Sequence, residues 1–328
     1  MRYAIIGVGG VGGLLGGLLA RSGAPVTFVA RGATLRALAA SGLHVKSMMG
    51  DFSVTRPQLC PSPIELRDVD VAFVCVKGWQ LDDVARELAA ASQFDGAVIP
   101  LVNGVDGTAV VEAAVGALRT IGGLCRMVSE IESPGVIRHW AVPPSVHCGE
   151  LDGCRSDRII EIASDLERSG VTTEVSTNII GAIWAKAAFI SSWGTFCAAA
   201  RAPIGEVRQT ALGQTVLRCA VEEILAVGAA AGVTLPQECA ATVFAEIMAL
   251  QAGATSSLQR DMDAGRQSEL DWQLGRLLTK APVHGVAVPT LSAAYAILHI
   301  RERTNAELRV GETGPPPQRM LTRPGIGD

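Results

Sequence analysis

Residues 2–12 read Arg2-Tyr-Ala-Ile-Ile-Gly7-Val8-Gly9-Gly10-Val11-Gly12, and a helical pattern rich in Leu, Gly and Ala follows. This order of a short apolar strand, a G-x-G-x-x-G turn and a helix is typical of dinucleotide-binding folds. The first glycine of such a turn permits the tight bend, the second lets backbone N–H groups approach a pyrophosphate, and the third lets helix and strand pack closely. The pattern predicts that residues 7–12 hold cofactor phosphates at the positive end of the helix.

Two other interpretations of this stretch are open. The run from Tyr3 to Ala20 carries no charge and follows Arg2, as in a secretory signal or a short membrane span. The many glycines between Gly7 and Gly17 would weaken either kind of helix. We therefore favour nucleotide binding.

The composition indicates a packed globular protein. With 328 residues, 48% hydrophobic and 18% charged, the chain is long enough for two domains with large cores. A net charge of −4 gives no electrostatic basis for binding nucleic acid or anionic membranes. The eight cysteines include no C-x-x-C pair, and we expect reduced thiols in a cytoplasmic protein. We expect no metal site, because the spacing of His147, Cys148 and Cys154 fits no zinc pattern.

Polar side chains follow three later apolar runs. Residues 25–30 lead to Arg31, residues 69–76 lead to Lys77, and residues 97–102 lead to Asn103. Helical patterns over 81–91 and 108–118 separate such runs, so the sequence predicts a doubly wound parallel sheet. The carboxyl ends of parallel strands meet at one edge, where such sheets bind ligands, and we expect these side chains and the glycine turn to line one crevice.

Arg31 bears on the choice of cofactor. An NAD-selective site usually carries Asp or Glu about 20 residues beyond the glycines, whereas here no acid occurs from Val26 to Leu43. A guanidinium pairs with a 2′-phosphate that a carboxylate would repel. The sequence therefore predicts NADP(H), unless Arg31 is an ordinary surface arginine.

The second half of the chain has a different character. Residues 44–55 predict a hairpin and residues 120–151 predict short β segments, but beyond about residue 176 long helical patterns dominate. We predict a nucleotide-binding domain at 1–177, a helical domain at 178–305 that also offers a dimer interface, and a flexible Pro/Gly-rich tail at 306–328.

Three places in the helical half can carry chemistry. Lys186 is the single charge in the apolar pattern over 179–196, so it either reaches a surface or sits where its pKa falls. A lysine with a lowered pKa suits a general acid for a carbonyl that becomes an alcohol. Ser256 or Ser257 either caps a helix or binds a ligand, and Glu269 is either an acid of a first helical turn or a site residue.

The motifs together resemble the ketopantoate reductases (2-dehydropantoate 2-reductases) from Met1 to about Arg303. The matching motifs, in chain order, are Gly7-Val-Gly-Gly-Val-Gly12, Val76-Lys77-Gly-Trp79-Gln80, Val102-Asn103-Gly104, Trp184-Ala-Lys186, Ser257 ahead of Ser268-Glu269-Leu-Asp271, and His284-Gly-Val-Ala-Val-Pro289. Each motif is weak alone, and their order and spacing are specific together.

The resemblance implies an α/β protein with an N-terminal Rossmann domain, a C-terminal all-helical domain and a substrate held between them. It implies that Arg31 and Lys77 bind NADPH and that Asn103 lies near nicotinamide and substrate. Lys186 would be the general acid, with Ser257 and Glu269 binding substrate. The implied catalytic residues are Lys186, Glu269 and Asn103, and the implied reaction is reduction of a 2-keto acid, in the first place 2-dehydropantoate in pantothenate biosynthesis.

One departure from the family pattern concerns the substrate. Asparagines expected four and eight residues after the lysine are Ile190 and Gly194 here. Losing two amides removes hydrogen bonds for a hydroxylated substrate, unless Ser191, Ser192 or Trp193 replaces them. A less polar 2-keto acid, another hydroxy-acid or opine-type dehydrogenase, and an NADP(H)-sensing protein with reduced turnover are the alternatives.

Overall fold

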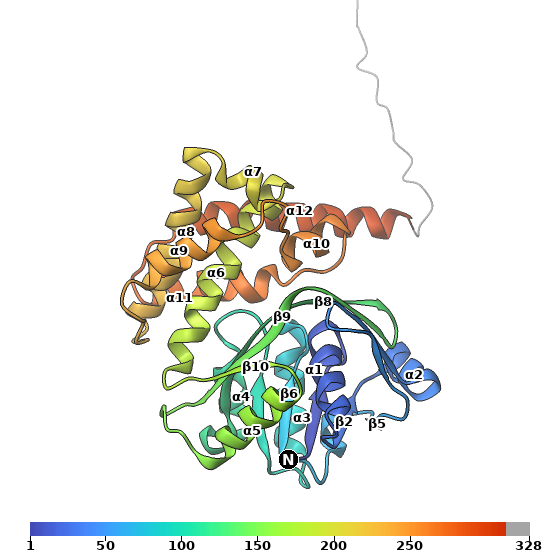
Figure 1. Cartoon of the computed structure of the whole chain (residues 1–328). Helices are drawn as coiled ribbons and strands as arrows, with labels where there is room; N and C mark the ends of the chain where they lie inside the picture. The colour runs from blue at the N-terminus through green and yellow to red at the C-terminus, as the bar shows by residue number, and fades with distance from the viewer. Residues whose placement is uncertain (313–328) are drawn as a thin grey trace, which may run out of the picture.

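The computed structural model describes residues 1–312, and it describes side chains as far as residue 304. The chain folds into a half built from two sheets with helices and a half built from helices alone (Figure 1). The last strand, β10 (Thr172–Val175), belongs to the first half, and the long helix α6 (Ile179–Ala200) opens the second. The predicted combination of an α/β half and a helical half is confirmed.

The first sheet is parallel throughout and is ordered β5-β2-β1-β6-β7. The strands are β1 (Tyr3–Ile6), β2 (Val26–Val29), β5 (Gln58–Cys60), β6 (Val71–Val74) and β7 (Ala97–Pro100). The helices after them are α1 (Gly10–Arg21), α2 (Gly32–Ser41), α3 (Leu81–Ala90) and α4 (Gly107–Val115), with short 3-10 turns η1 (Pro63–Glu65), η2 (Gly78–Gln80) and η3 (Ala117–Arg119). The strand order reverses at β1, which puts a ligand-binding switch point beside the glycine turn.

A second sheet covers α1 and faces the helical half (Figure 1). It contains β3 (Leu43–Ser47), β4 (Phe52–Val54), β8 (Ile121–Ser133), β9 (Val136–Glu150) and β10, with helix α5 (Asp157–Arg168) before β10. The hairpin predicted at 44–55 is confirmed by the antiparallel pair β3 and β4. The β structure predicted at 120–151 is confirmed, but its division into short segments is wrong, because the chain forms two long antiparallel strands. Register shifts and Val142, at φ 59°, interrupt the alternating pattern of these strands.

The many glycines of α1 are explained by its place between the two sheets. Gly7 has φ +92°, a conformation that side chains rarely adopt, and it turns the chain from β1 into α1. A Cβ on Gly12 would lie 2.1 Å from the Gly7 carbonyl oxygen, and one on Gly13 would lie 2.5 Å from Ile137 of β9. One face of the helix thus packs on β1 and another on the second sheet, so the residues first compared with a signal or membrane helix form a strand, a turn and a buried helix.

The helical half packs around α6. The other helices are α7 (Ile204–Arg208), α8 (Ala211–Ala230), α9 (Cys239–Ala249), α10 (Ser257–Asp263), the π-helical turn η4 (Asp271–Gly275), α11 (Arg276–Val283) and α12 (Pro289–Glu312). Helix α6 is long and apolar enough to cross a membrane by length and composition, but 61% of its apolar window is buried within the protein, as in a core helix. Residues 306–312 of the predicted tail belong to α12, and residues 313–328 lie outside the described residues.

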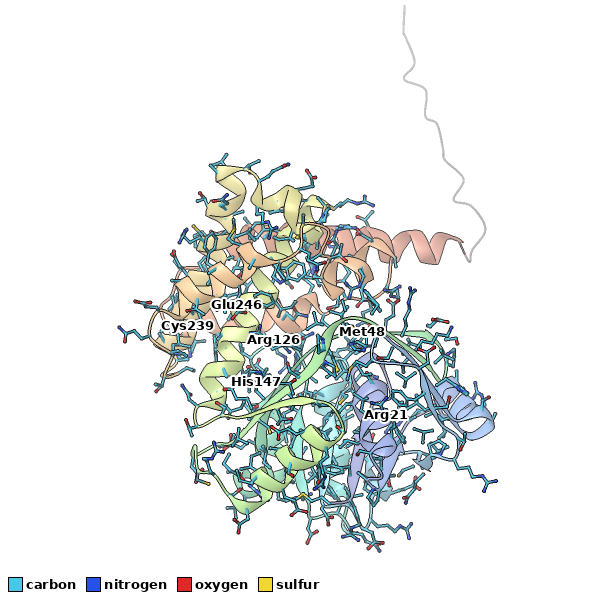
Figure 2. The ribbon with its side chains drawn as sticks, in the orientation of Figure 1. Arg21, Met48, Arg126, His147, Cys239 and Glu246 are labelled. Atoms are coloured by element: carbon cyan, nitrogen blue, oxygen red, sulfur yellow. The ribbon has the colours of Figure 1, made fainter. Side chains whose placement is uncertain are left out.

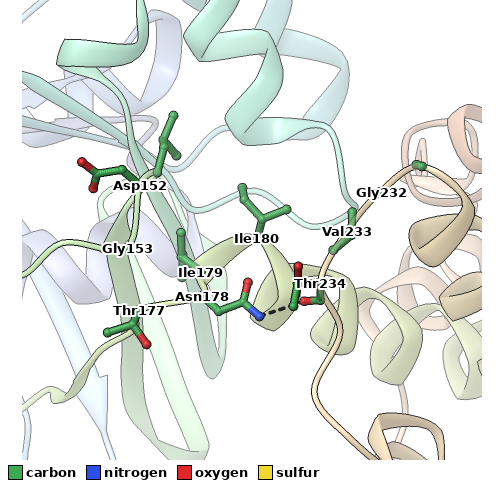
Figure 3. A pocket seen from close by; sticks show the side chains of 11 residues that line it. Asp152, Gly153, Thr177, Asn178, Ile179, Ile180, Gly232, Val233 and Thr234 are labelled. Atoms are coloured by element: carbon green, nitrogen blue, oxygen red, sulfur yellow. Dashed lines mark hydrogen bonds between the residues drawn. The ribbon is translucent and has the colours of Figure 1, made fainter.

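A pocket of about 320 Å³ lies where the two halves join (Figure 3). Its lining comes from the turn after β9, the start of α6 and the α8–α9 connection. Asn178 caps α6 by accepting from the Gly181 N–H, and its amide donates to the Thr234 carbonyl oxygen at 2.8 Å. The start of α6 is therefore tied to its own half at the point where the chain passes between the halves.

Candidate active site

Lys186 and Asn103 meet across the junction of the two halves. Lys186 lies on the second turn of α6, and its Nζ donates to Asn103 Oδ1 at 3.1 Å. Asn103 follows β7, at the carboxyl edge of the parallel sheet. Burial among apolar neighbours lowers the pKa of Lys186; the charge of Arg126 lowers it further, and Cys125 and Glu269 oppose the shift. The structure thus brings together two residues that lie far apart in the sequence.

Glu269 makes a second junction between the halves. It is 5% exposed, and its Oε1 accepts from the Gly78 N–H at 3.0 Å while Oε2 lies 3.5 Å from Lys77 Nζ. Lys77 also donates to Asp261 of α10 at 3.0 Å, and the two carboxylates raise the pKa of its ammonium against the effect of burial. Lys77, predicted as a cofactor cation, therefore pairs here with carboxylates of the helical half.

Trp272 is a site residue that the sequence prediction did not single out. Its indole Nε1 donates to the Asn103 carbonyl oxygen at 2.6 Å. A Cβ on Gly78 would lie 2.0 Å from the Trp272 ring, so the ring packs flat against the backbone after β6. Arg276 lies over the ring at 4.0 Å, and a groove of about 820 Å³ is lined by Trp272, Arg276 and Asp82 among others. A tryptophan directly after the Ser268-Glu269 motif was the available signal.

The glycine turn and Arg31 lie at the same edge of the sheet. No atom lies within 4 Å of a Cβ built on Gly9, so its backbone is open to a ligand, whereas Val8 is buried. This open turn at the start of α1 fits a dinucleotide pyrophosphate. Arg31 is 60% exposed, and its guanidinium contacts both carboxylate oxygens of Glu87 at 2.5 Å. The predicted phosphate-binding arginine is thus paired with an acid from α3.

The serines of α10 divide into a cap and a candidate ligand residue. Ser256 is the N-cap, and its hydroxyl accepts from the Gln259 N–H at 3.0 Å. Ser257 is the first residue of the helix and is half-buried, which leaves its side chain outside the cap. A Cβ on Gly194 would lie 3.2 Å from Ser256 Cβ and Oγ, so α6 and α10 touch where the family pattern carries an asparagine. The close contact explains the glycine.

Arg126, which points toward the helical half and Glu246 (Figure 2), is close enough for its charge to act on Lys186, and the sequence prediction did not name it either. It comes from β8, where its neighbours Leu124 and Cys125 are apolar. Its Nη1 donates to Glu246 of α9 at 2.8 Å, and its guanidinium lies 5.3 Å from the Phe189 ring centroid. A lone cation in an apolar strand pattern was the signal that could have found it.

This arrangement can protonate an oxygen and hold an anion. Lys186 offers an ammonium with a lowered pKa, Asn103 orients that ammonium, and the glycine turn offers backbone donors for phosphates. These groups meet at the edge of the sheet where parallel α/β folds bind dinucleotides. The geometry therefore suits an acid-assisted reduction of a carbonyl with a dinucleotide cofactor.

Known proteins are similar to this chain over almost its whole length. The model of the family "Ketopantoate reductase PanE/ApbA" matches residues 3–153, and the model of its C-terminal part matches residues 178–302. An uncharacterized oxidoreductase of Bacillus subtilis, YkpB, is 30% identical over 92% of this chain and 99% of its own length. A 2-dehydropantoate 2-reductase of Halobacterium salinarum is 28% identical with the same coverage of the two chains. The crystal structure of a PanE/ApbA family ketopantoate reductase from Ralstonia eutropha is 26% identical, with a TM-score of 0.84 over 93% of this chain and 100% of that chain.

Proposed function

Since the chain belongs to the ketopantoate reductase family, whose members are NADP-dependent oxidoreductases that reduce 2-keto acids, we propose that it reduces 2-dehydropantoate to pantoate in pantothenate biosynthesis. The observation that supports this most directly is the contact of Lys186 with Asn103 at the cofactor edge of the sheet. The eight cysteines are all free, which fits a protein of the reducing cytoplasm.

Separate groups of residues have the proposed roles of binding the cofactor, donating the proton and binding the substrate. The Gly7–Gly12 turn, open at Gly9, would hold the phosphates of NADPH, and Arg31 and Lys77 would be the cations near it. NADPH, when bound, would supply the hydride for the 2-keto carbon. Lys186 donates its proton to the carbonyl oxygen as the alkoxide forms, and Asn103 fixes the direction of that ammonium. Ser257 and Glu269 contribute to the substrate side. In this proposal, catalysis comes from holding the substrate next to the hydride and from a Lys186 charge that is in place before the alkoxide forms.

A second candidate for the substrate is a less polar 2-keto acid. Ile190 packs against the helical core and Gly194 touches α10, so neither position offers an amide for a substrate hydroxyl. The matched pair of 2-dehydropantoate and 3,3-dimethyl-2-oxobutanoate differs only by that hydroxyl. A site that hydrogen-bonds it rejects the deoxy compound by about 10⁴-fold, whereas an apolar site discriminates by about 100-fold or less.

The test is a steady-state assay of both acids with NADPH and NADH. Preference for 2-dehydropantoate by several orders of magnitude supports the first proposal, and preference for the deoxy acid supports the second. Turnover of neither acid, with tight NADP(H) binding, would favour the sensing role. Turnover of an imine or of another acid would favour an opine-type or other hydroxy-acid dehydrogenase. The oligomeric state, for which we propose a homodimer, is read from the sedimentation of the same preparation.

Lys186→Ala tests the proposed general acid. We expect kcat/KM to fall by about 10²–10⁴-fold, because the alkoxide then forms without a positioned proton donor. The dissociation constant of NADPH, measured by fluorescence titration, should change little. Wild-type turnover in this variant would remove the assigned role.

A further inference from the structure

Arg126 lies beside the candidate site, and the proposed reaction has no step for it. Its guanidinium is over the ring of Phe189, which follows Lys186 by three residues on α6. Side chains three residues apart project from the same face of a helix. Arg126 and Lys186 therefore reach the same face of α6, one from β8 and the other from the helix itself.

The guanidinium of Arg126 has donors to spare. In the described part of the chain it makes one hydrogen bond, from Nη1 to Glu246, and its Nε is buried without a partner. The Nε–Nη2 edge of an arginine is the edge that binds a carboxylate with two parallel hydrogen bonds. Glu246 takes Nη1 and Nε is buried, so Nη2 is the nitrogen of this edge that is left for a ligand, on a side chain that is 39% exposed.

We propose that Arg126 binds the carboxylate of the 2-keto acid substrate through Nη2 of its guanidinium while the keto oxygen faces Lys186. This inference rests on the proposed function. The carboxylate and the keto group of such a substrate are on adjacent carbons, and two cations on one face of α6 match two adjacent oxygen-bearing groups. Glu246 and Phe189 hold the guanidinium by one hydrogen bond and by ring contact, which fixes it before substrate arrives.

The competing interpretation is that Arg126 only joins the two halves through Glu246. The two interpretations predict different preferences for the keto acid over its neutral amide. A site that binds the carboxylate distinguishes the acid from the amide, whereas an ion pair that only joins the two halves does not. The probes are the preferred keto acid of the matched pair and its primary amide, each assayed with saturating NADPH. Wild-type protein should prefer the acid.

Arg126→Gln should reduce that preference by about 10- to 100-fold, through a higher KM for the acid with little change for the amide. Arg126→Lys, which keeps the charge but loses the planar guanidinium, should have an acid preference between those of Arg126→Gln and wild type. Glu246→Gln is the matched control, because it removes the charge of the same ion pair while its amide oxygen can still accept from Nη1 of Arg126. It should lower the acid preference far less than Arg126→Gln, and thermal melting should show all three variants folded.

The outcomes separate this inference from the function on which it rests. If Arg126→Gln slows acid and amide equally, as a purely structural pair requires, Arg126 does not bind the carboxylate. If Arg126→Gln does not fold, the same comparison in Arg126→Lys decides, and an unchanged acid preference there overturns the inference. Wild-type protein that reduces no 2-keto acid would overturn the proposed function itself, before any variant is compared.

Discussion

Lys186 carries its charge in a place that disfavours charge. Its pKa is lowered by burial and by Arg126, while Cys125 and Glu269 act in the opposite direction, and Asn103 is a neutral acceptor. In the proposed reduction the protonated form of Lys186 is the proton donor. The rate should therefore be constant at low pH and fall as the pH rises through the lowered pKa of Lys186, below the ordinary lysine range.

The measurement is kcat/KM for reduction against pH. Arg126→Gln removes a cation that lowers the pKa of Lys186, so the falling limb should move to higher pH. A limb that stays in place in this variant, or that persists in Lys186→Ala, would mean that another group controls the profile.

Arg31 faces a competitor for the cofactor phosphate. Glu87 holds its guanidinium and also accepts a hydrogen bond from Ser62 Oγ at 2.5 Å. A 2′-phosphate on Arg31 must displace this carboxylate or lie beside it. Glu87→Gln should therefore lower the KM of NADPH several-fold more than that of NADH, and Arg31→Ala should raise the KM of NADPH about 10- to 100-fold.

Both effects are read from kcat/KM with the two cofactors. Asp83→Asn, on the exposed side of the same helix and paired with Arg86, is the matched control and should leave the cofactor ratio unchanged. Equal changes for NADPH and NADH in Arg31→Ala would mean that this arginine does not contact the phosphate.

At the scale of elements, the contact between α6 and α10 positions Ser257, the proposed substrate residue. Gly194 lets Ser256 approach, and Ser256 caps α10 just before Ser257. Gly194→Asn, which restores the family residue, should destabilise the fold by about 1–3 kcal/mol, because its side chain must push α10 away.

The measurement is the free energy of unfolding in urea. Ser256→Gly in the Gly194→Asn background should recover part of the loss, because glycine removes the contacting atoms and is a fair N-cap. Ile190→Asn is the contrasting change, because that side chain is only partly buried. Stability of Gly194→Asn equal to wild type would show that the two helices adjust without cost.

The helices and parallel strands were predictable because their signals are local. The apolar runs before Arg31, Lys77 and Asn103 became β2, β6 and β7 almost as predicted. The two long strands β8 and β9 were not predictable in this way. Their pairing joins positions that are distant in the sequence, and their polar residues and register shifts hide the alternation of apolar and polar side chains. Gly194 looked like a missing asparagine, because no local pattern shows that a second helix touches it.

Across the whole molecule, Trp272 couples the two halves. It comes from the helical half, packs on the Gly78 backbone and donates to the carbonyl oxygen of Asn103. Trp272→Phe keeps the packing but leaves that carbonyl without its partner, at a cost of about 1–3 kcal/mol. Because Asn103 orients Lys186, we expect kcat/KM to fall about 10-fold while the protein stays folded.

Steady-state kinetics measures this, with Trp140→Phe, a half-exposed tryptophan on β9, as the control. Unchanged kinetics in Trp272→Phe would show that the position of Asn103 does not depend on the indole. The sequence could place Lys186, Asn103 and Glu269 in one site only through the resemblance to a family. Glu87 was beyond its reach, because it acts through a partner on another element, whereas Trp272 and Arg126 left only weak local signals.

The glycine-lined helix α1 has a mechanical consequence. Its close contacts with β1 on one side and with β9 on the other leave no room for it to slide or rotate. The turn proposed to carry the cofactor phosphates is therefore a fixed anchor. Lys186 belongs to the helical half, so its distance from that anchor depends on how the two halves are joined, and the contacts of Asn103, Glu269 and Trp272 across the junction set it.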